Sequence, residues 1–480
     1  MGKSVIVKNL IWKFSERVLA QIVSLIVTIV LARLLDPQHY GTVARVTVFI
    51  TIADAFVTSG IPASLIQAKD VTEEHFSSVF YFNLVFSCLL YLLMFITAPF
   101  ISVFYKDVLL TPLIRVMGLR IIVAAVNSVQ HAFVSRNMMF KKYFFSTLFG
   151  TLVSGIVGIS LAYFGFGPWA LVGQYLSNTL IDTVVLFFTV AWRPLLFFSW
   201  EKVKSLLGFG WRMLFEGVFG NIYAQMQNLV IGRCYTSADL AYYNKGEQLP
   251  SIVINNISIS ISSVLFPAMA SRQENKEDVT QLLRKSARYT SYVVFPILTM
   301  MAGLSDSIIT ILLTDKWLGC SVYMKIFCVI YALQVGMYPR HQALNGIGRS
   351  DVFMNEHIVG RCVGIVVLLL LYRKGVLAVG ISGLIGTTVQ GLIIMYTSFK
   401  YNDYRLVHQI TDVLHIVFAC TIVYVSLIAI EMLIPNVWLN LIVGAMAGGL
   451  EYLLLMNLMK SDEQDYLLGI FKSYVRRIKA

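Results

Sequence analysis

Long apolar stretches follow one another along almost the whole chain, separated by short clusters of charged and turn-forming residues. Most stretches run for about twenty residues, the length at which an α-helix crosses the hydrocarbon layer of a bilayer. Because backbone polar groups in lipid must pair within their own segment, the stretches predict helices. The pattern predicts about fourteen transmembrane helices, at residues 13–33, 41–63, 77–99, 111–134, 144–164, 168–191, 209–231, 241–267, 287–313, 320–343, 354–372, 375–398, 411–434 and 437–458.

Composition supports this interpretation. Hydrophobic residues make up 57% of the 480 residues and charged residues 13%, and the mean hydropathy is +0.73. In a soluble protein, about a quarter of all residues are charged. We therefore expect an all-α polytopic membrane protein with no soluble domain inserted between its helices.

The net charge of +12 comes from lysine and arginine clusters that fall mainly on alternate loops. One set of loops carries about three times as many cations as the other, which predicts that both chain termini are cytoplasmic. The cations are scattered over loops and do not alternate with aromatic residues in a basic domain, so nucleic-acid binding is not expected. The first apolar run is too long for the core of a cleaved signal peptide.

Cysteine and histidine patterns predict no metal site and no cofactor. None of the six cysteines forms a C-x-x-C pair, and the seven histidines form no H-x-x-x-H pair. Disulfides and metal centres are therefore not expected. The chain also lacks a phosphate-binding loop, so no ATPase activity is expected.

The chain repeats itself with a period of about 200 residues. Residues 30–49 resemble 230–249, residues 164–187 resemble 372–395, and residues 131–143 resemble 341–353. The repeat predicts two six-helix bundles (residues 1–200 and 201–400) related by an axis along the membrane normal, with two further helices and a basic tail at 401–480. Two such bundles suggest a central cleft and alternating access. The other interpretation is that Gly- and Arg-rich turns look alike in any membrane protein.

Polar residues recur at helical spacing inside several predicted spans. Such residues are costly in lipid and normally face a cavity or a partner. Such residues form a polar stripe along one face of a helix. The stripes contain most polar residues on the first two helices and on their repeat counterparts. The candidate cleft residues are Arg17, Gln21, Asp54, Arg120, Asn127, Arg212, Glu216, Tyr223, Gln227, Glu247 and Asn255.

Each of these stripes also has a structural explanation. Ser and Thr often only join helices, and the side chains of Arg17 and Arg212 can reach the lipid headgroups. Arg212 and Glu216, four residues apart, can neutralise each other. Asp54 and Glu247 are harder to explain in this way, because a buried carboxylate needs a proton or a partner.

Several motifs resemble those of a known family. They are Leu31-Ala32-Arg33-Leu34-Leu35-Asp36-Pro37 with Tyr40-Gly41, Ala53-Asp54, Ala63-Ser64-Leu65-Ile66-Gln67, Thr72-Glu73-Glu74 and Val79-Phe80-Tyr81-Phe82-Asn83, followed by Ile231-Gly232-Arg233, Ala241-Tyr242-Tyr243, Leu265-Phe266-Pro267 and Ala343-Leu344-Asn345-Gly346-Ile347-Gly348-Arg349. Over essentially its whole length, the chain resembles bacterial polysaccharide-transport proteins, the lipid-linked oligosaccharide flippases. These share a superfamily with multidrug and toxin extruders and with peptidoglycan lipid flippases.

The resemblance implies a flippase for polyprenyl-diphosphate-linked oligosaccharides in the bacterial cytoplasmic membrane, serving O-antigen, capsule or exopolysaccharide synthesis. Cleft arginines would hold the diphosphate, with Arg17 and Arg212 as first candidates and Arg120 and Arg340 behind them. Amide and hydroxyl side chains would meet the sugar, and the lipid tail would stay in the bilayer. Asp54 and Glu247 would couple transport to protons or sodium, and a polysaccharide polymerase or export machinery is a possible partner.

Three other classes stay open. An ion-coupled drug extruder of the same superfamily usually has twelve helices. A membrane polymerase, ligase or glycosyltransferase usually needs a sizeable outer loop, and the loops here are short. A scaffold without transport is disfavoured by the paired polar stripes. The sugar composition of the cargo, the coupling ion and the oligomeric state are not predicted.

Overall fold

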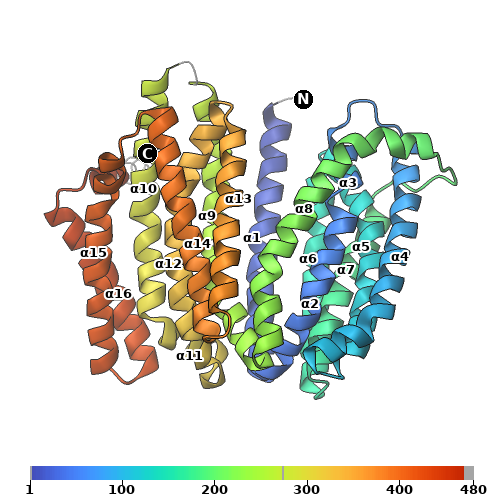
Figure 1. Ribbon diagram of the computed structural model, residues 1–480, viewed down its shortest axis with the longest axis horizontal. Helices are drawn as coiled ribbons and strands as arrows, with labels where there is room; N and C mark the ends of the chain where they lie inside the picture. The colour runs from blue at the N-terminus through green and yellow to red at the C-terminus, as the bar shows by residue number, and fades with distance from the viewer. Residues whose placement is uncertain (1–2, 273–274, 470–480) are drawn as a thin grey trace. The chain divides into compact units, whose positions relative to one another are not determined.

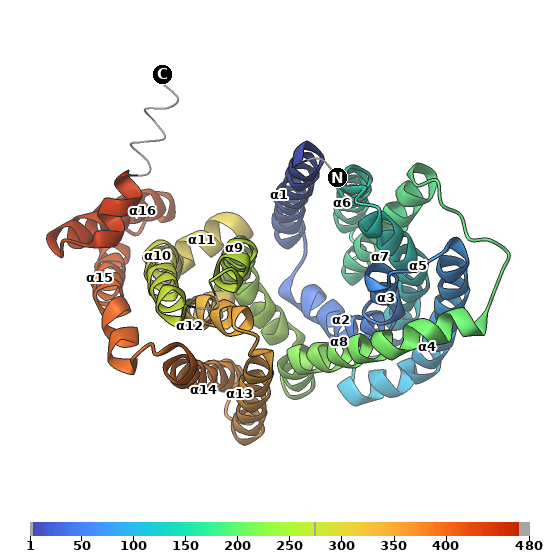
Figure 2. The ribbon, with the colours of Figure 1, turned by 90° about the horizontal axis from the view of Figure 1, so that it is seen from above.

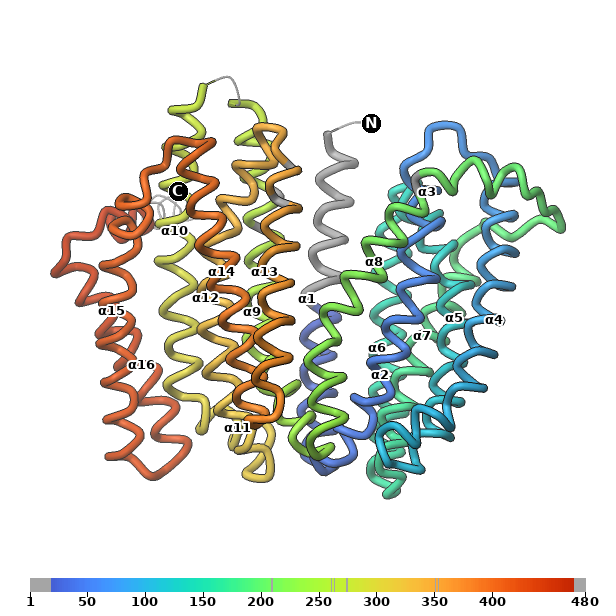
Figure 3. Tube along the Cα trace, in the orientation of Figure 1, coloured from blue at the N-terminus to red at the C-terminus, as the bar shows by residue number. Residues whose placement is uncertain are grey.

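The structure is a computed structural model in which every element of the described residues is a helix (Figures 1 and 3). It describes the backbone of residues 3–272 and 275–469, and the side chains of these residues from 19 onward except 209, 260, 263, 350 and 353. The described elements are α1 (Lys3–Leu34), α2 (Pro37–Thr58), α3 (Ile61–Gln67), α4 (Glu73–Tyr105), α5 (Leu110–Arg136), α6 (Phe140–Tyr163), α7 (Pro168–Thr189), α8 (Trp200–Cys234), α9 (Ser237–Ala270), α10 (Lys276–Gly303), α11 (Ser305–Leu313), the 3-10 helix η1 (Asp315–Cys320), α12 (Ser321–Gly346), α13 (Ser350–Leu371), α14 (Val376–Asn402), α15 (Leu406–Leu433) and α16 (Val437–Leu458).

The predicted all-α polytopic membrane fold is confirmed. Within the described residues, eleven segments are long and apolar enough to cross a membrane, and the pair α10–α11, bent by 71°, makes twelve. The two remaining predicted spans fall on α1, of which Leu19–Leu34 counts as a shorter apolar helix, and on α8. Each predicted span therefore coincides with a helix or a helix pair, while the number that crosses the membrane stays a prediction.

Polar side chains cap the starts of α10 and α16. The four N–H groups at a helix start have no partner within the helix and are commonly met by a capping side chain. The Asn275 side-chain oxygen accepts from the N–H groups of Glu277 and Asp278, at 3.0 and 3.4 Å. Asn436 caps α16 in the same way, through two bonds of 3.1 Å. Asn275 lies well before the predicted span 287–313, so the hydropathy pattern underestimates the length of α10, whereas α16 begins at residue 437 as predicted.

By contact, the chain forms two compact units, Met1–Ala241 and Tyr242–Ala480. The same three helix pairs recur in each unit: α4–α5, α5–α7 and α6–α7 in the first, and α10–α12, α12–α14 and α13–α14 in the second. Figure 2 shows these helices along their axes. This recurrence supports the internal repeat. The domain boundaries at 200 and 400 and the central cleft stay predictions.

In the first unit, an apolar core forms between α2, α5 and α7, with Ile50, Ile114 and Met117 fully buried. Helix α8 packs along α2, α3 and α4, and the Ser64 hydroxyl of α3 donates to the Leu206 carbonyl oxygen of α8 over 3.2 Å. By contact, α8 therefore belongs to the unit that precedes it, although the repeat pairs it with α1.

Gly41 marks the tightest approach in this unit. A Cβ atom at Gly41 would lie only 1.6 Å from the carbonyl oxygen of Ser237, at the start of α9. No side-chain rearrangement relieves contact with a backbone oxygen, so the two helices meet here only because residue 41 lacks a side chain. This gives a physical reason for the Tyr40-Gly41 motif.

We expect Gly41→Ala to destabilise the protein by about 1–3 kcal/mol, because the added methyl group forces the backbones apart. The control is Gly449→Ala in α16, where a Cβ meets nothing within 4 Å and alanine favours the helix. Thermal unfolding of both purified variants in detergent tests this. Equal unfolding temperatures would contradict the close approach.

A buried ion cluster joins α10 to the segment after α16 in the second unit. The Glu463 side chain is fully buried and accepts hydrogen bonds from Arg288 and Ser461, while His415 Nε2 lies 3.5 Å away. Burial works to raise the pKa of the Glu463 carboxyl, but hydrogen bonds from His415 and Arg288 outweigh it and hold that pKa well below its usual range. The ionised carboxylate therefore stabilises the fold.

We expect Glu463→Gln to lower the unfolding temperature at pH 7, by an amount equivalent to about 2 kcal/mol. Because the folded pKa is depressed, the stabilisation is complete above the unfolded pKa of about 4.3 and is lost as pH falls through the folded value. The gap between variant and parent should narrow below about pH 4. Asp462→Asn is the control, because Asp462 bonds the same arginine at 3.1 Å but is 81% exposed; an equal loss there would refute this reasoning.

Candidate functional site

Three helices of the first unit bring two predicted site residues together. Arg120 of α5 lies between α2 and α7: one of its terminal nitrogens is 3.3 Å from the Asp54 carboxylate, and its Nε donates to the Thr179 hydroxyl over 3.0 Å. Both charged side chains are mostly buried, with 28% and 15% of their surfaces exposed. The two polar residues that the sequence places on different helices are therefore partners.

A second polar cluster lies two turns further along α5. The Asn127 side-chain amide donates to the Asp182 carboxylate of α7 over 2.6 Å, and His131 Nε2 lies 2.9 Å from the same carboxylate oxygen. The other oxygen of Asp182 is buried and has no hydrogen-bond partner among the described residues, as is also true of one oxygen of Asp54. Buried oxygens of this kind can take a proton, a water molecule or a small cation.

In the second unit, Glu247 of α9 and Arg340 of α12 do not meet, because Glu247 contacts α12 at a different point from Arg340. The Tyr331 hydroxyl of α12 donates to the Glu247 carboxylate of α9 over 3.1 Å. Arg340 is 5% exposed; its Nε donates to the Gln409 side-chain oxygen over 3.0 Å, and a terminal nitrogen bonds the Gly336 carbonyl oxygen. Positions 331 and 340 are about 13 Å apart along the helix. Arg340 thus belongs to a packed network.

The remaining candidates lie on α1, α8 and α9. Arg212, Glu216 and Asn255 are exposed, and Gln21, Tyr223 and Gln227 are half-buried. Arg17 lies outside the described side chains. The α8 stripe therefore offers an exposed cation and an exposed carboxylate one turn apart.

The search for polar stripes in the sequence did not identify two buried cations, because each is a single residue near a helix start. Arg45 is 7% exposed; it donates to the Tyr235 carbonyl oxygen over 3.1 Å, lies 3.6 Å from the Asp107 carboxylate and sits over the Tyr105 ring. Lys245 is 8% exposed and lies 5.9 Å from the centre of the Trp317 ring. The two positions are 200 residues apart and match in the repeat, so comparison of the halves would have found them.

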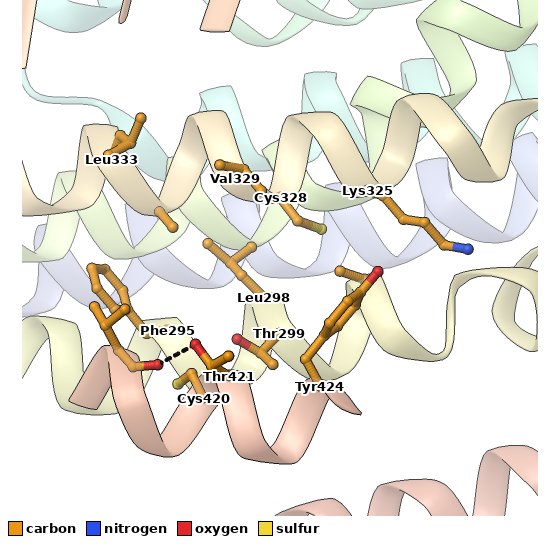
Figure 4. Close-up of a pocket in the computed structure, with 13 residues that line it drawn as sticks. Phe295, Leu298, Thr299, Lys325, Cys328, Val329, Leu333, Cys420, Thr421 and Tyr424 are labelled. Atoms are coloured by element: carbon orange, nitrogen blue, oxygen red, sulfur yellow. Dashed lines mark hydrogen bonds between the residues drawn. The ribbon is translucent and has the colours of Figure 1, made fainter. Parts of the chain in front are cut away.

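An apolar pocket of about 410 Å³ lies between α10, α12 and α15 in the second unit. Figure 4 shows Lys325 and Tyr424 at one end of the pocket and Phe295 and Leu333 at the other. The lining between them is mainly aliphatic. The pocket therefore suits a hydrocarbon chain better than a sugar.

Comparison with known proteins identifies the family. Residues 30–322 match the family described as polysaccharide biosynthesis protein, which is more than half of the chain. The chain therefore belongs to this family, and the expected resemblance is confirmed.

Three relatives have named roles. The chain is 24% identical over 64% of its length to the teichuronic acid biosynthesis protein TuaB of Bacillus subtilis. It is 24% identical over 60% to the succinoglycan biosynthesis transport protein ExoT of Rhizobium meliloti, and 22% identical over 67% to the lipopolysaccharide biosynthesis protein WzxC of Escherichia coli. The matches span 63%, 58% and 66% of these relatives' own lengths.

Solved structures with the same fold are membrane transporters. The lipid II flippase MurJ in an inward closed conformation superposes with a TM-score of 0.76 at 13% identity, covering 95% of this chain and 99% of that one. An inward-facing multidrug transporter of the MATE family superposes with a TM-score of 0.61 at 16% identity, covering 83% and 98%. At these identities the likeness concerns the fold, and it marks the chain as a multi-pass membrane protein.

We expect the pair Asp54 and Arg120 to be energetically coupled. Removing one partner leaves a buried charge unpaired, so Asp54→Asn and Arg120→Gln together should cost less than the sum of the single changes. A coupling of about 0.5–3 kcal/mol is typical for contacting residues. Thermal unfolding of the two single variants and the double variant measures it.

The matched control is the pair Lys202 and Glu74, at 3.2 Å and with 33% and 47% of the side-chain surfaces exposed, for which at most about 1 kcal/mol is expected. Strict additivity at Asp54 and Arg120 would show that they do not interact in the folded protein.

Proposed function

We propose that this protein is a flippase that moves polyprenyl-diphosphate-linked oligosaccharide repeat units across the bacterial cytoplasmic membrane by alternating access. Membership of the polysaccharide biosynthesis family, over residues 30–322, carries the proposal. The names of the relatives add teichuronic acid, succinoglycan and lipopolysaccharide biosynthesis as the pathways in which such proteins act. The fold likeness to a lipid II flippase is consistent with a cargo of the same chemical class.

The cargo has three chemically different parts, and the chain offers a matching environment for each. An anionic diphosphate suits arginine, which donates two parallel hydrogen bonds to it. Of the predicted arginines, Arg212 is exposed, whereas Arg120 and Arg340 are held by partners. We therefore rank Arg212 first among the described arginines as a diphosphate ligand. Tyr223 and Gln227, further along the same stripe of α8, would meet sugar hydroxyls.

The apolar pocket between α10, α12 and α15 would receive part of the lipid tail. Its aliphatic lining and its volume of about 410 Å³ suit a short length of isoprenoid chain. Lys325 at the polar end would face the charged portion of the lipid. This arrangement keeps the tail in an apolar environment while the headgroup moves.

Transport would be coupled to an ion through Asp54 and Glu247. Asp54 holds Arg120 and also has a buried oxygen without a hydrogen-bond partner among the described residues. A proton or a sodium ion on this carboxylate would weaken its hold on Arg120. Ion binding would thereby alter the contact between α2 and α5.

The proposal includes the setting of the protein. Both termini would be cytoplasmic, since the loops on that side carry most of the lysine and arginine. A polysaccharide polymerase that consumes the translocated unit is a natural partner. We propose no enzymatic activity for the chain.

Deletion of the gene in its native host tests this function. We expect loss of a surface polysaccharide, with lipid-linked repeat units retained on the cytoplasmic side of the membrane. Unchanged polysaccharide together with new sensitivity to cationic drugs would instead identify an extruder. Repeat units that reach the outer face but stay unpolymerised would point to an enzyme.

Complementation with Arg212→Ala should fail to restore export, while the variant reaches the membrane at normal abundance. Arg212 is exposed, so its loss should cost little stability. Arg373→Ala is the matched control, because Arg373 is exposed and contacts the neighbouring Tyr372. Normal export by Arg212→Ala would exclude this arginine as a diphosphate ligand, and failure of both variants would indicate a general effect of lost charge.

A further inference from the structure

A histidine on the fourth long helix of each repeat meets a carboxylate, but the two units form this contact with different residues and helices. In the first unit His131 of α5 contacts Asp182 of α7. In the second unit the matching histidine, His341 of α12, contacts Glu356 of α13. The helix pairing confirms that the positions correspond: Gly150 packs on Asp182, and its counterpart Gly360 packs on Gln390, which occupies the place of Asp182 in the repeat.

The second unit adds another imidazole to this position. His357 follows Glu356 on α13, and its ring centre lies 5.3 Å from that of His341. One ligand atom from each of His341, Glu356 and His357 lies within 4.8 Å of the others. Among the described residues, no other group of three such side chains is as close. His341 and Glu356 are buried, and His357 is half-buried.

The Glu356 carboxylate is the unusual member of this group. Its side chain is fully buried, and one oxygen contacts His341 while the other has no hydrogen-bond partner among the described residues. A buried carboxylate oxygen normally has a partner, because leaving it without one costs about 1–3 kcal/mol or more. A cation held by the carboxylate and the two imidazoles would supply that partner.

Gln390 of α14 provides the outer support that such a site needs. Its side-chain amide lies 3.0 Å from Nδ1 of His357. The same amide lies 3.4 Å from Nε2 of that ring. The two ends of an amide are interchangeable by rotation, and with its oxygen toward Nδ1 the amide accepts the ring proton, so that Nε2 carries the lone pair that can bind a metal. Metal-binding histidines are usually oriented by an oxygen in this manner.

We propose that His341, Glu356 and His357 form a binding site for a divalent transition metal, with zinc as the best fit. Two imidazoles and one carboxylate form a ligand set found in zinc sites that keep a fourth position for water or another ligand. Imidazole ligands disfavour calcium and magnesium, which prefer oxygen alone. The site joins the end of α12 to the beginning of α13 and so fixes the turn at residues 347–349. It is independent of the proposed flippase function.

The test uses the full chain purified in detergent with an affinity tag other than polyhistidine. After chelation and removal of the chelator, Co²⁺ is titrated as a spectroscopic probe, and Zn²⁺ is then added in competition. We expect one Co²⁺ per chain with the intense visible absorption of four-coordinate cobalt, and displacement of that cobalt by Zn²⁺.

The variants His341→Gln, Glu356→Gln and His357→Asn keep polar side chains at all three positions. Each should weaken Co²⁺ binding at least tenfold, since even loss of a supporting residue costs about 10–100-fold. His131→Gln is the matched control from the first unit, and His408→Gln is a surface control, because His408 is exposed. Both should bind cobalt as the parent does.

Zinc should also raise the unfolding temperature of the parent and of the two controls but not that of the three site variants. This second measurement compares each folded protein with and without metal, so it does not depend on the variants being as stable as the parent. Cobalt binding that is unaffected by Glu356→Gln and His357→Asn, or no stoichiometric binding by the parent, would overturn the proposal.

Discussion

Inside a membrane protein, a charged or polar side chain must find its partner within the chain, and this constraint organises both units. Asp54 and Arg120 meet across α2 and α5, and Asp182 gathers an amide and an imidazole from α5. Lipid offers no hydrogen bonds. A polar group without a hydrogen-bond partner therefore costs more free energy than most apolar contacts at the same place contribute. The polar contacts therefore specify which helix faces meet, while the apolar residues between them fill the remaining space.

Hydropathy was sufficient to predict the all-α polytopic fold and the helices on which the predicted spans fall, because span length and apolarity follow directly from the thickness of the bilayer. It was insufficient at the helix ends, which depend on caps such as Asn275, and for the number of spans, since α8 carries too many polar residues to pass as apolar. The polar stripes included Asp54, Arg120 and Asn127, which the structure brings into polar contacts with other helices; their part in binding stays a prediction. They missed Asp182, because a single carboxylate forms no stripe and its partners lie more than 50 residues away.

Equivalent positions in the two halves of the internal repeat keep similar packing but form different polar contacts. Close helix contacts are retained at Gly150 and Gly360, and a buried cation next to an aromatic ring is retained at positions 45 and 245. The side chains themselves differ: the first unit has a guanidinium that reaches two partners, and the second an ammonium that donates to Gln248. Arginine makes such a forked contact because of its planar geometry, which lysine lacks. Equivalent positions thus keep their place in the fold while their bonding changes.

The polarity of α8 also bears on how the protein is made. A nascent helix leaves the translocation channel sideways when its own apolarity favours lipid, and α8, with six or more polar side chains along its length, has little such preference. Its contacts are with α2, α3 and α4, all of which are synthesised earlier. The predicted insertion of α8 therefore depends on helices that are already in the membrane. Ribosomes must complete the first part of the chain before the middle can be placed, so the order of the helices is also an order of assembly.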